Sequence, residues 1–202
     1  MTPAALAGLI RARAGAGPAR FLTAIAGPPG AGKSTLAAAL ATTLGAGARV
    51  VPMDGFHYDD AVLNARGLRA RKGAPDTFDA AGLLHLLHRL RSEAEVAIPV
   101  FDRSLELSRA GADIVLPADR LLIVEGNWLL LATPPWDALA PLFDLTIMLT
   151  LPEAEIDRRL QARWARHGKT PDQARHWIDS NDMPNARRVL TGSRPADLTI
   201  PG

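Results

Sequence analysis

The sequence predicts an α/β fold with a doubly wound, mainly parallel sheet of about five strands and helices on both faces. Three observations support this prediction. Strand-like apolar runs alternate with helix-like segments along the chain. A glycine-rich loop joins one apolar run to a helix-forming segment. Acidic residues follow several apolar runs, at the strand ends where α/β folds bind their ligands.

The composition predicts a single domain over residues 1–202. With 202 residues, 48% of them hydrophobic, the chain can bury one core. The absence of cysteine excludes disulfides and thiolate metal sites. No apolar run approaches the roughly 20 residues of a membrane span, and the N-terminal segment lacks a signal peptide's order of charge before apolar core. We therefore expect no membrane insertion and a cytoplasmic location.

The net charge of +2 is too small to indicate a nucleic-acid-binding protein, but basic residues are concentrated in two segments. Residues 66–72 hold three arginines and a lysine without an acid, and residues 158–188 hold seven arginines and a lysine against three aspartates. Such segments predict contacts with phosphate groups. The alternative for each arginine is a solvated helix face.

Residues 27–35 read GPPGAGKST and fit the pattern G-x-x-x-x-G-K-[S/T] of a phosphate-binding loop. An apolar strand precedes them, and the helix formers LAAALATTL follow. In such a loop Lys33 reaches the β- and γ-phosphates, and the Ser34 hydroxyl ligates Mg²⁺. The alternative is a glycine-rich turn that merely carries a lysine. The candidate nucleotide-binding residues are Gly27, Pro28, Pro29, Gly30, Ala31, Gly32, Lys33, Ser34 and Thr35.

The remaining elements follow from apolar patterns and helix-capping signals. We expect strands near residues 49–53, 96–101, 121–124, 142–151 and 196–200, and a hairpin strand within 112–120. Helices are expected at the N-terminus, before Gly45, after Asp79, and after Pro152, Pro171 and Pro184. Residues 55–78 show no clear periodicity, and such long segments are often functional. The apolar face of the N-terminal helix can pack on its own domain or on a second subunit, which leaves a homodimer open.

Three acidic residues follow predicted strands. Phosphoryl transfer needs one carboxylate to orient or deprotonate the attacking hydroxyl and others to hold Mg²⁺. We select Asp54 as the base, and we place Glu125 near Mg²⁺ because it follows a strongly apolar strand. Asp102 follows a third strand. The alternatives for all three are a helix cap or a surface ion pair.

Several motifs together resemble the uridine kinase, pantothenate kinase and phosphoribulokinase group of P-loop kinases. They are GPPGAGKST, DGFHYDD, FDRSLELS, IVEGNWLLL and the later NDMPNARRV, in that order. Within this group the chain most resembles small bacterial proteins called fructose transport system kinases. The resemblance implies ATP- and Mg²⁺-dependent phosphorylation of a small hydroxyl compound.

The resemblance also implies roles for particular residues. Asp54 matches the catalytic aspartate, and Lys33 lies in the phosphate loop. A lid over residues 153–190 carries Arg159, Arg163 and Arg166, and an acceptor segment covers residues 54–78. The candidate acceptor-binding residues are Phe56, His57, Tyr58, Phe78, Asp102 and Arg103. Phe56, Tyr58, Phe78 and Trp128 can stack on a sugar or a base, or pack in the core.

The acceptor is left open by the sequence. Carboxylates and Arg103 suit several hydroxyls and favour a sugar such as fructose, with a nucleoside or pantothenate as alternatives. A competing class is an NTPase switch coupled to a protein partner. The acceptor segment and the base after the second strand favour the kinase, and the absence of N-K-x-D argues against a GTPase.

Overall fold

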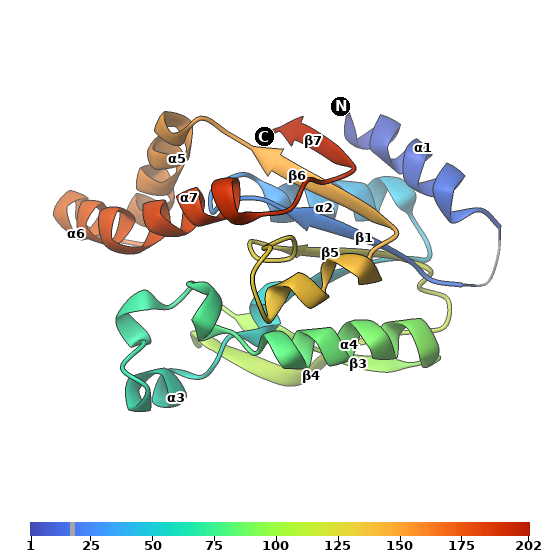
Figure 1. Ribbon diagram of the computed structural model, residues 1–202, viewed down its shortest axis with the longest axis horizontal. Helices are drawn as coiled ribbons and strands as arrows, with labels where there is room; N and C mark the ends of the chain where they lie inside the picture. Colours follow the sequence, from blue (N-terminus) through green and yellow to red (C-terminus); the bar gives the residue numbers. More distant parts are fainter. Residues whose placement is uncertain (17–18) are drawn as a thin grey trace.

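The computed structural model describes residues 1–16 and 19–202 and shows the expected five-stranded parallel sheet between two layers of helices (Figure 1). The strand order is β2-β5-β1-β6-β7, and every neighbouring pair is parallel. The strands are β1 (Phe21–Ala26), β2 (Ala48–Pro52), β5 (Leu121–Gly126), β6 (Leu145–Thr150) and β7 (Leu198–Pro201). The predicted fold class is therefore confirmed.

Two apolar clusters cover the opposite faces of the sheet. Successive side chains of β1 alternate between them: Leu22 and Ala24 belong to the cluster beneath α4, whereas Phe21 and Ile25 belong to the cluster beneath α1 and α2. The helices are α1 (Pro3–Ala14), α2 (Lys33–Leu44), α3 (Asp60–Ala65), α4 (Ala80–Ser92), α5 (Glu153–Arg166), α6 (Pro171–Trp177) and α7 (Met183–Gly192). Burial on both faces explains why β1 and β5 read as continuous apolar runs.

The N-terminal helix α1 packs on its own domain. Leu6 and Ile10 are buried in the same cluster as Leu40 of α2. The Arg11 guanidinium donates to the carbonyl oxygens of Thr43 and Leu44, at 3.0 and 3.1 Å. These are carbonyls at the end of α2, where the helix itself provides no donor. The apolar face of α1 is thus covered without a second subunit.

A separate two-stranded antiparallel sheet, β3 (Val96–Asp102) and β4 (Leu107–Val115), lies beside α4. We expected the hairpin strand within residues 112–120, whereas β4 begins at Leu107. The reason is a short turn that returns the chain at once, with Glu106 in a left-handed conformation at φ 54°. Because β3 pairs with β4 in this separate sheet, Asp102 at the end of β3 does not lie at the edge of the parallel sheet.

The segment between β2 and α4 contains more helix than its sequence pattern indicated. A 3₁₀ turn (Met53–Phe56) follows β2, then α3, then two further 3₁₀ turns (Arg69–Arg71 and Pro75–Thr77). The side chain of Asp59 caps α3 by accepting a hydrogen bond from the amide of Ala61 at 2.7 Å. A six-residue helix is too short to show periodicity. The predicted cap of α4 is confirmed, since Asp79 accepts from Gly82 N at 2.8 Å.

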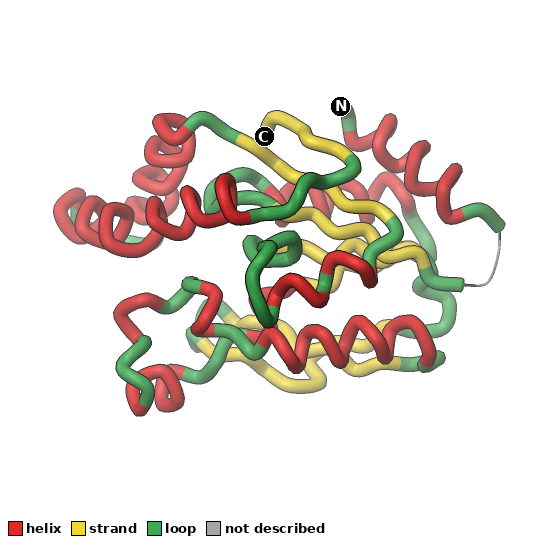
Figure 2. Tube along the Cα trace, viewed as in Figure 1, coloured by secondary structure: helices red, strands yellow, loops and turns green. Residues whose placement is uncertain are grey.

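Helices α5, α6 and α7 lie at the carboxyl ends of the strands, opposite the segment that contains α3 (Figures 1 and 2). They fall in the range 153–190 expected for a lid, and we refer to them as the lid helices or the lid. A π-helical segment, Ile178–Asp182, joins α6 to α7 without a break. The third predicted lid helix consequently has no separate start at Pro184. The lid helices therefore lie across from the acceptor segment, residues 54–78.

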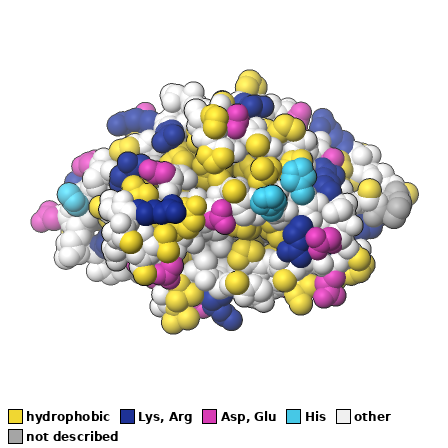
Figure 3. All heavy atoms as spheres, turned by 60° about the horizontal axis from the view of Figure 1, so that its bottom comes forward, with side chains coloured by type: hydrophobic (Ala, Val, Ile, Leu, Met, Phe, Trp, Pro, Cys, Tyr) yellow, Lys and Arg dark blue, Asp and Glu magenta, His cyan; other side chains and the backbone are white. Residues whose placement is uncertain are grey.

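The surface near α4 and the hairpin carries acidic and basic side chains interspersed around an apolar area (Figure 3). In residues 1–16 and 19–202, no helix is long and apolar enough to cross a membrane.

Candidate active site

The loop between β1 and α2 has the geometry of a phosphate-binding loop. Gly32 is the N-cap of α2 and adopts a left-handed conformation, with φ 88° and ψ 18°, that favours glycine. Gly27 packs so closely on the neighbouring strand that a Cβ would lie 2.9 Å from the carbonyl oxygen of Leu149. The loop therefore presents the N-terminus of α2, where free N–H groups favour an anion.

Lys33 and Glu125 form the charged floor of the cleft. The Lys33 ammonium donates to the carbonyl of Pro28 at 3.0 Å. Burial lowers the pKa of Lys33 to about 8, against the opposing effect of the Glu125 and Asp54 carboxylates. Burial also raises the pKa of Glu125, which Lys33 opposes, and Asp54 adds to the rise. Ser34, in the first turn of α2, is a hydrogen-bonding neighbour of Glu125.

Close packing at two glycines positions Asp54 at the carboxyl end of β2. A Cβ on Gly55 would lie 2.4 Å from the carbonyl oxygen of Pro99 in β3. A Cβ on Gly126, the residue after Glu125, would lie 2.4 Å from the Cβ of Met53. The glycines that follow the two acids in DG and EG thus allow β5, the turn after β2 and the hairpin to meet.

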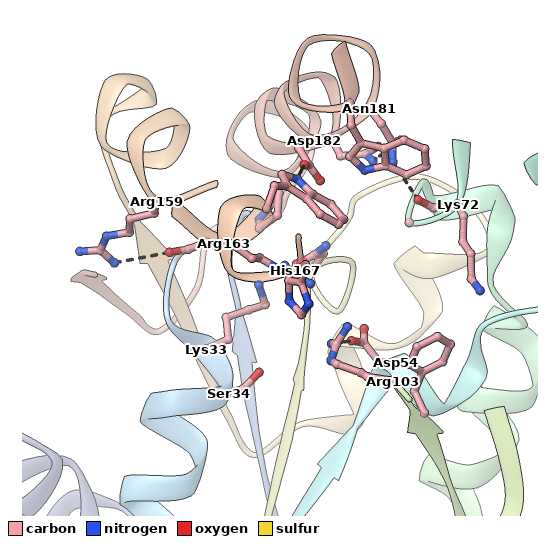
Figure 4. Close-up of a pocket in the computed structure, with 18 of the residues that line it drawn as sticks. Lys33, Ser34, Asp54, Lys72, Arg103, Arg159, Arg163, His167, Asn181 and Asp182 are labelled. Carbon is pink, nitrogen blue, oxygen red and sulfur yellow. Dashed lines mark hydrogen bonds and ion pairs between the residues drawn. The ribbon is translucent and has the colours of Figure 1, made fainter. Parts of the chain in front are cut away.

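Arg103 lies in the turn after β3 and contacts Asp54. Its Nη2 donates to Oδ2 of Asp54 at 2.6 Å, in a pair that is partly exposed to the cleft. Figure 4 shows this pair across the cleft from Lys33 and Ser34. The proposed base and the phosphate loop therefore face the same space.

The cleft between these residues has a volume of about 860 Å³. Arg163, His167 and Arg166 line it from the lid. Burial lowers the pKa of Arg163, with the Arg103 charge acting in the same direction. Arg159 also lines the cleft, but its guanidinium pairs with Glu155 at 2.6 Å and contacts the carbonyl of Gly30 at 3.4 Å, pointing away from the cleft centre in Figure 4.

The structure brings three of the six predicted acceptor residues to the cleft. His57, Phe78 and Arg103 line it. Phe56 and Tyr58 are outside the lining, and Trp128 is fully buried in the core. Asp102 departs from its expected place at the sheet edge, because its carboxylate accepts from Ser104 N at 3.0 Å and from Ser104 Oγ at 2.6 Å within the hairpin turn.

Several lining residues were not singled out from the sequence. Lys72 lies in the acceptor segment, and its carbonyl accepts a hydrogen bond from Nδ2 of Asn181 at 2.8 Å. This bond joins the lid directly to the acceptor segment, and Asn185 donates to Asn181 at 3.1 Å within the lid. The sequence signals for Lys72 were the basic run 66–72 and the predicted acceptor segment 54–78. Arg69, Arg158 and Lys169 also line the cleft, from the two basic segments predicted to contact phosphate. The lining residues that sequence reasoning missed include Asn127, Trp164, His167, Trp177 and Asp182.

Within the described ranges 1–16 and 19–202, no group of three or more His, Cys, Asp or Glu side chains could hold a metal ion. Ser34 and Glu125 nevertheless fit Mg²⁺, because both offer oxygen and both line the cleft beside Lys33. Mg²⁺ commonly takes only one or two protein oxygens and completes its octahedron with water and phosphate.

No family model matches the chain. It is 37% identical over 187 residues to the Escherichia coli K12 "Uncharacterized protein YggC", covering 90% of this chain and 77% of that one. It is 36% identical over 195 residues to the Schizosaccharomyces pombe "Putative uridine kinase C227.14", covering 90% and 83%. The crystal structure of a "putative fructose transport system kinase" from Silicibacter sp. TM1040 superimposes with a TM-score of 0.94 and 45% identity, covering both chains completely.

The fold and the phosphate loop define a P-loop kinase of the α/β class. More particularly, the chain belongs to the uridine kinase-like group of P-loop kinases, as its identity with the S. pombe protein over most of both chains shows. It is an ATP-dependent small-molecule kinase, and the resemblance stated from its motifs is confirmed.

Proposed function

We propose that the protein transfers the γ-phosphoryl group of ATP to a hydroxyl of a small metabolite, a sugar such as fructose. The observation that carries this proposal is the position of Asp54. Its carboxylate lies at the carboxyl end of β2 and lines the same cleft as Lys33 and Ser34 of the phosphate loop. A hydroxyl compound bound beside Asp54 would face the terminal phosphate of ATP.

In the proposed reaction the acceptor oxygen attacks the γ-phosphorus as its proton passes to Asp54. The bond between the γ-phosphorus and the bridging oxygen breaks, and ADP leaves with that oxygen. Arg103, 2.6 Å from Asp54, orients the carboxylate and hydrogen-bonds the acceptor. Lys33, at the N-terminus of α2, neutralises charge on the β- and γ-phosphates.

The lid and the metal complete the site. Arg163 and Arg166 would stabilise charge on the transferred group, and the lid would exclude water from it. Ser34 and Glu125 would hold Mg²⁺, which neutralises phosphate charge and fixes the position of the triphosphate. Arg159 pairs with Glu155 and contacts Gly30 O, which fits a role in holding the lid to the phosphate loop.

The sugar acceptor is supported by side chains that suit several hydroxyls, and by the name of the Silicibacter relative. The alternatives are a nucleoside, supported by the name of the S. pombe relative, and pantothenate. A pantothenate kinase of Mycolicibacterium vanbaalenii is 30% identical over 181 residues, but the match covers only 58% of that protein.

The test is ADP formation by purified protein with Mg²⁺ and ATP, with fructose, other hexoses, pentoses, uridine, cytidine or pantothenate as acceptor. We expect one acceptor class to raise turnover well above the blank without acceptor, with its phosphorylated product found by mass spectrometry. Turnover that equals the blank in every tube would contradict the proposed transfer and favour an NTPase switch.

The variant Asp54→Asn tests the base. It should keep ATP binding and lose transfer, because general acid–base catalysis contributes about 10²–10⁴-fold to rate. Asp137→Asn is the matched control, because Asp137 is outside the residues that line the cleft. Turnover of Asp54→Asn close to that of Asp137→Asn would remove Asp54 from this role.

A further inference from the structure

Among the described residues, three cationic side chains line the acceptor side of the cleft, and each contacts a carboxylate. Arg69 Nε and Lys72 Nζ bind the two oxygens of Asp60 at 2.6 and 2.8 Å. Arg103 binds Asp54 at 2.6 Å. Although residues 66–72 are strongly basic in the sequence, the charges of Arg69, Arg71 and Lys72 are compensated in space.

Lys72 has a second carboxylate from another part of the chain. Its ammonium lies 3.1 Å from Oε1 of Glu106 at the hairpin turn, and it also donates to the Glu106 carbonyl at 3.1 Å. The Lys72 side chain is only 7% exposed, and its ammonium lies 5.0 Å from the centre of the Phe101 ring. A buried ammonium with two carboxylates has little capacity to bind a third anion.

The histidine on this wall adds no positive charge. Burial lowers the pKa of His57 to about 4, and the ring lies 3.9 Å from the centre of Phe78 and 5.1 Å from that of Phe101. At neutral pH it is therefore an uncharged imidazole. Together with the paired cations, it makes this wall electrically neutral.

The side of the cleft formed by the phosphate loop and the lid differs from the acceptor wall in its charge. Lys33 lies in the phosphate loop, and Arg163 and Arg166 line the cleft from the lid. Lys169 is also there, over the rings of Trp164 and Trp177. An excess of cations on this side suits a triphosphate. The charge of the cleft is thus divided, positive toward the triphosphate and neutral toward the acceptor.

We propose that the acceptor is an uncharged polyhydroxyl compound, and that Asp60 and Glu106 exclude anionic acceptors by neutralising Lys72. The inference rests on the phosphoryl transfer proposed above and specifies its substrate class. An acceptor carrying a carboxylate or a phosphate would meet Asp54 and Glu106 on a wall whose own cations are already paired with carboxylates. Like charges brought together in this way disfavour binding, which is a means of specificity.

The experiment compares pairs of acceptors that differ in one anionic group: fructose with fructose 6-phosphate, glycerol with glycerate, and pantothenol with pantothenate. We expect the neutral member of an active pair to have the higher kcat/KM by about tenfold or more, the effect of one unfavourable charge contact. An anionic member that is used as well as, or better than, its neutral partner would overturn the inference while leaving the kinase intact.

Binding provides a second readout that does not need turnover. Calorimetric titration of the same pairs, with a non-hydrolysable ATP analogue and Mg²⁺ present, should show heat for neutral members only. If no compound raises turnover, the proposed transfer has failed, and these titrations still decide the charge of the ligand. Tighter binding of an anionic member would refute our assignment.

The variant Glu106→Gln tests the residue assignment. Removing one of the two carboxylates at Lys72 should shift the anionic-to-neutral ratio of kcat/KM by about fivefold or more toward the anion. The control is Glu95→Gln, which removes an exposed carboxylate from the segment before β3. An unchanged ratio in Glu106→Gln, with Asp60→Asn also unchanged, would overturn the role of these carboxylates.

Discussion

Gly55→Ala should lower both stability and turnover, because of the close packing behind Asp54. The added Cβ would lie 2.4 Å from the carbonyl oxygen of Pro99 and 2.7 Å from its carbonyl carbon. Both are backbone atoms of β3, so relief requires movement of the hairpin or of the turn after β2. Overpacking of this kind costs about 1–3 kcal/mol, which for a domain of this size lowers Tm by about 2–12 °C.

The same movement would displace the neighbouring Asp54. A misplacement of about 1 Å at a reacting group can cost on the order of 10²-fold in rate, so kcat should fall by about 10- to 100-fold. The Arg103 contact at 2.6 Å depends on the same turn and should weaken with it.

Gly8→Ala is the control, and its expected effect on the free energy of unfolding has the opposite sign to that of Gly55→Ala. Gly8 lies within α1, is exposed, and has no atom within 4 Å of an added Cβ. Alanine there should stabilise the protein by about 0.5–1 kcal/mol. Both variants are measured by thermal unfolding and by ADP formation with the acceptor identified as above. Wild-type Tm and kcat in Gly55→Ala would refute the reasoning, since the close approach would then be unnecessary.

Two further predictions concern the acceptor wall. The pKa of His57 is about 4 in the folded protein and ordinarily 6.5, so as the pH falls the unfolded chain binds a proton at this histidine before the folded protein does. Protonation then favours the unfolded state, and the stability that the neutral, buried His57 contributes is lost as the pH falls from about 6.5 to 4. Urea unfolding should show that the difference in free energy of unfolding between wild type and His57→Gln shrinks over that pH window. The control is His85→Gln, at an exposed position of α4. A difference for His57→Gln that stays constant with pH would contradict the lowered pKa of His57. Asn181→Ala should raise hydrolysis of ATP without acceptor relative to transfer, because it removes the 2.8 Å contact between lid and Lys72; an unchanged ratio of hydrolysis to transfer would mean that the contact does not couple them.

The parts of the site that could be predicted are those encoded in short stretches of sequence. The phosphate loop depends on glycines and a lysine within nine residues, between a buried strand and a helix. Asp54 and Glu125 were found because they follow apolar strands, and parallel strands bring their carboxyl ends to one edge. The structure places both at that edge, lining the cleft.

The rest depends on pairing between distant segments, which local patterns do not record. Asp102 follows an apolar strand as Asp54 does, but its strand pairs with β4 and not with the parallel sheet. Its carboxylate therefore caps a turn. The contact of Asn181 with Lys72 spans 109 positions of sequence, and no periodicity indicates it.

Charge shows the difference most directly. Counted along the chain, residues 66–72 are a basic segment and suggest a site for an anion. In the fold, Asp60 approaches from α3 and Glu106 from the hairpin turn, and Lys72 becomes the centre of a compensated cluster. The Lys72 carbonyl meanwhile accepts from the lid, and the next carbonyl, that of Gly73, accepts from the buried Trp128 indole at 3.1 Å. One short segment thus joins the acceptor wall, the lid and the core.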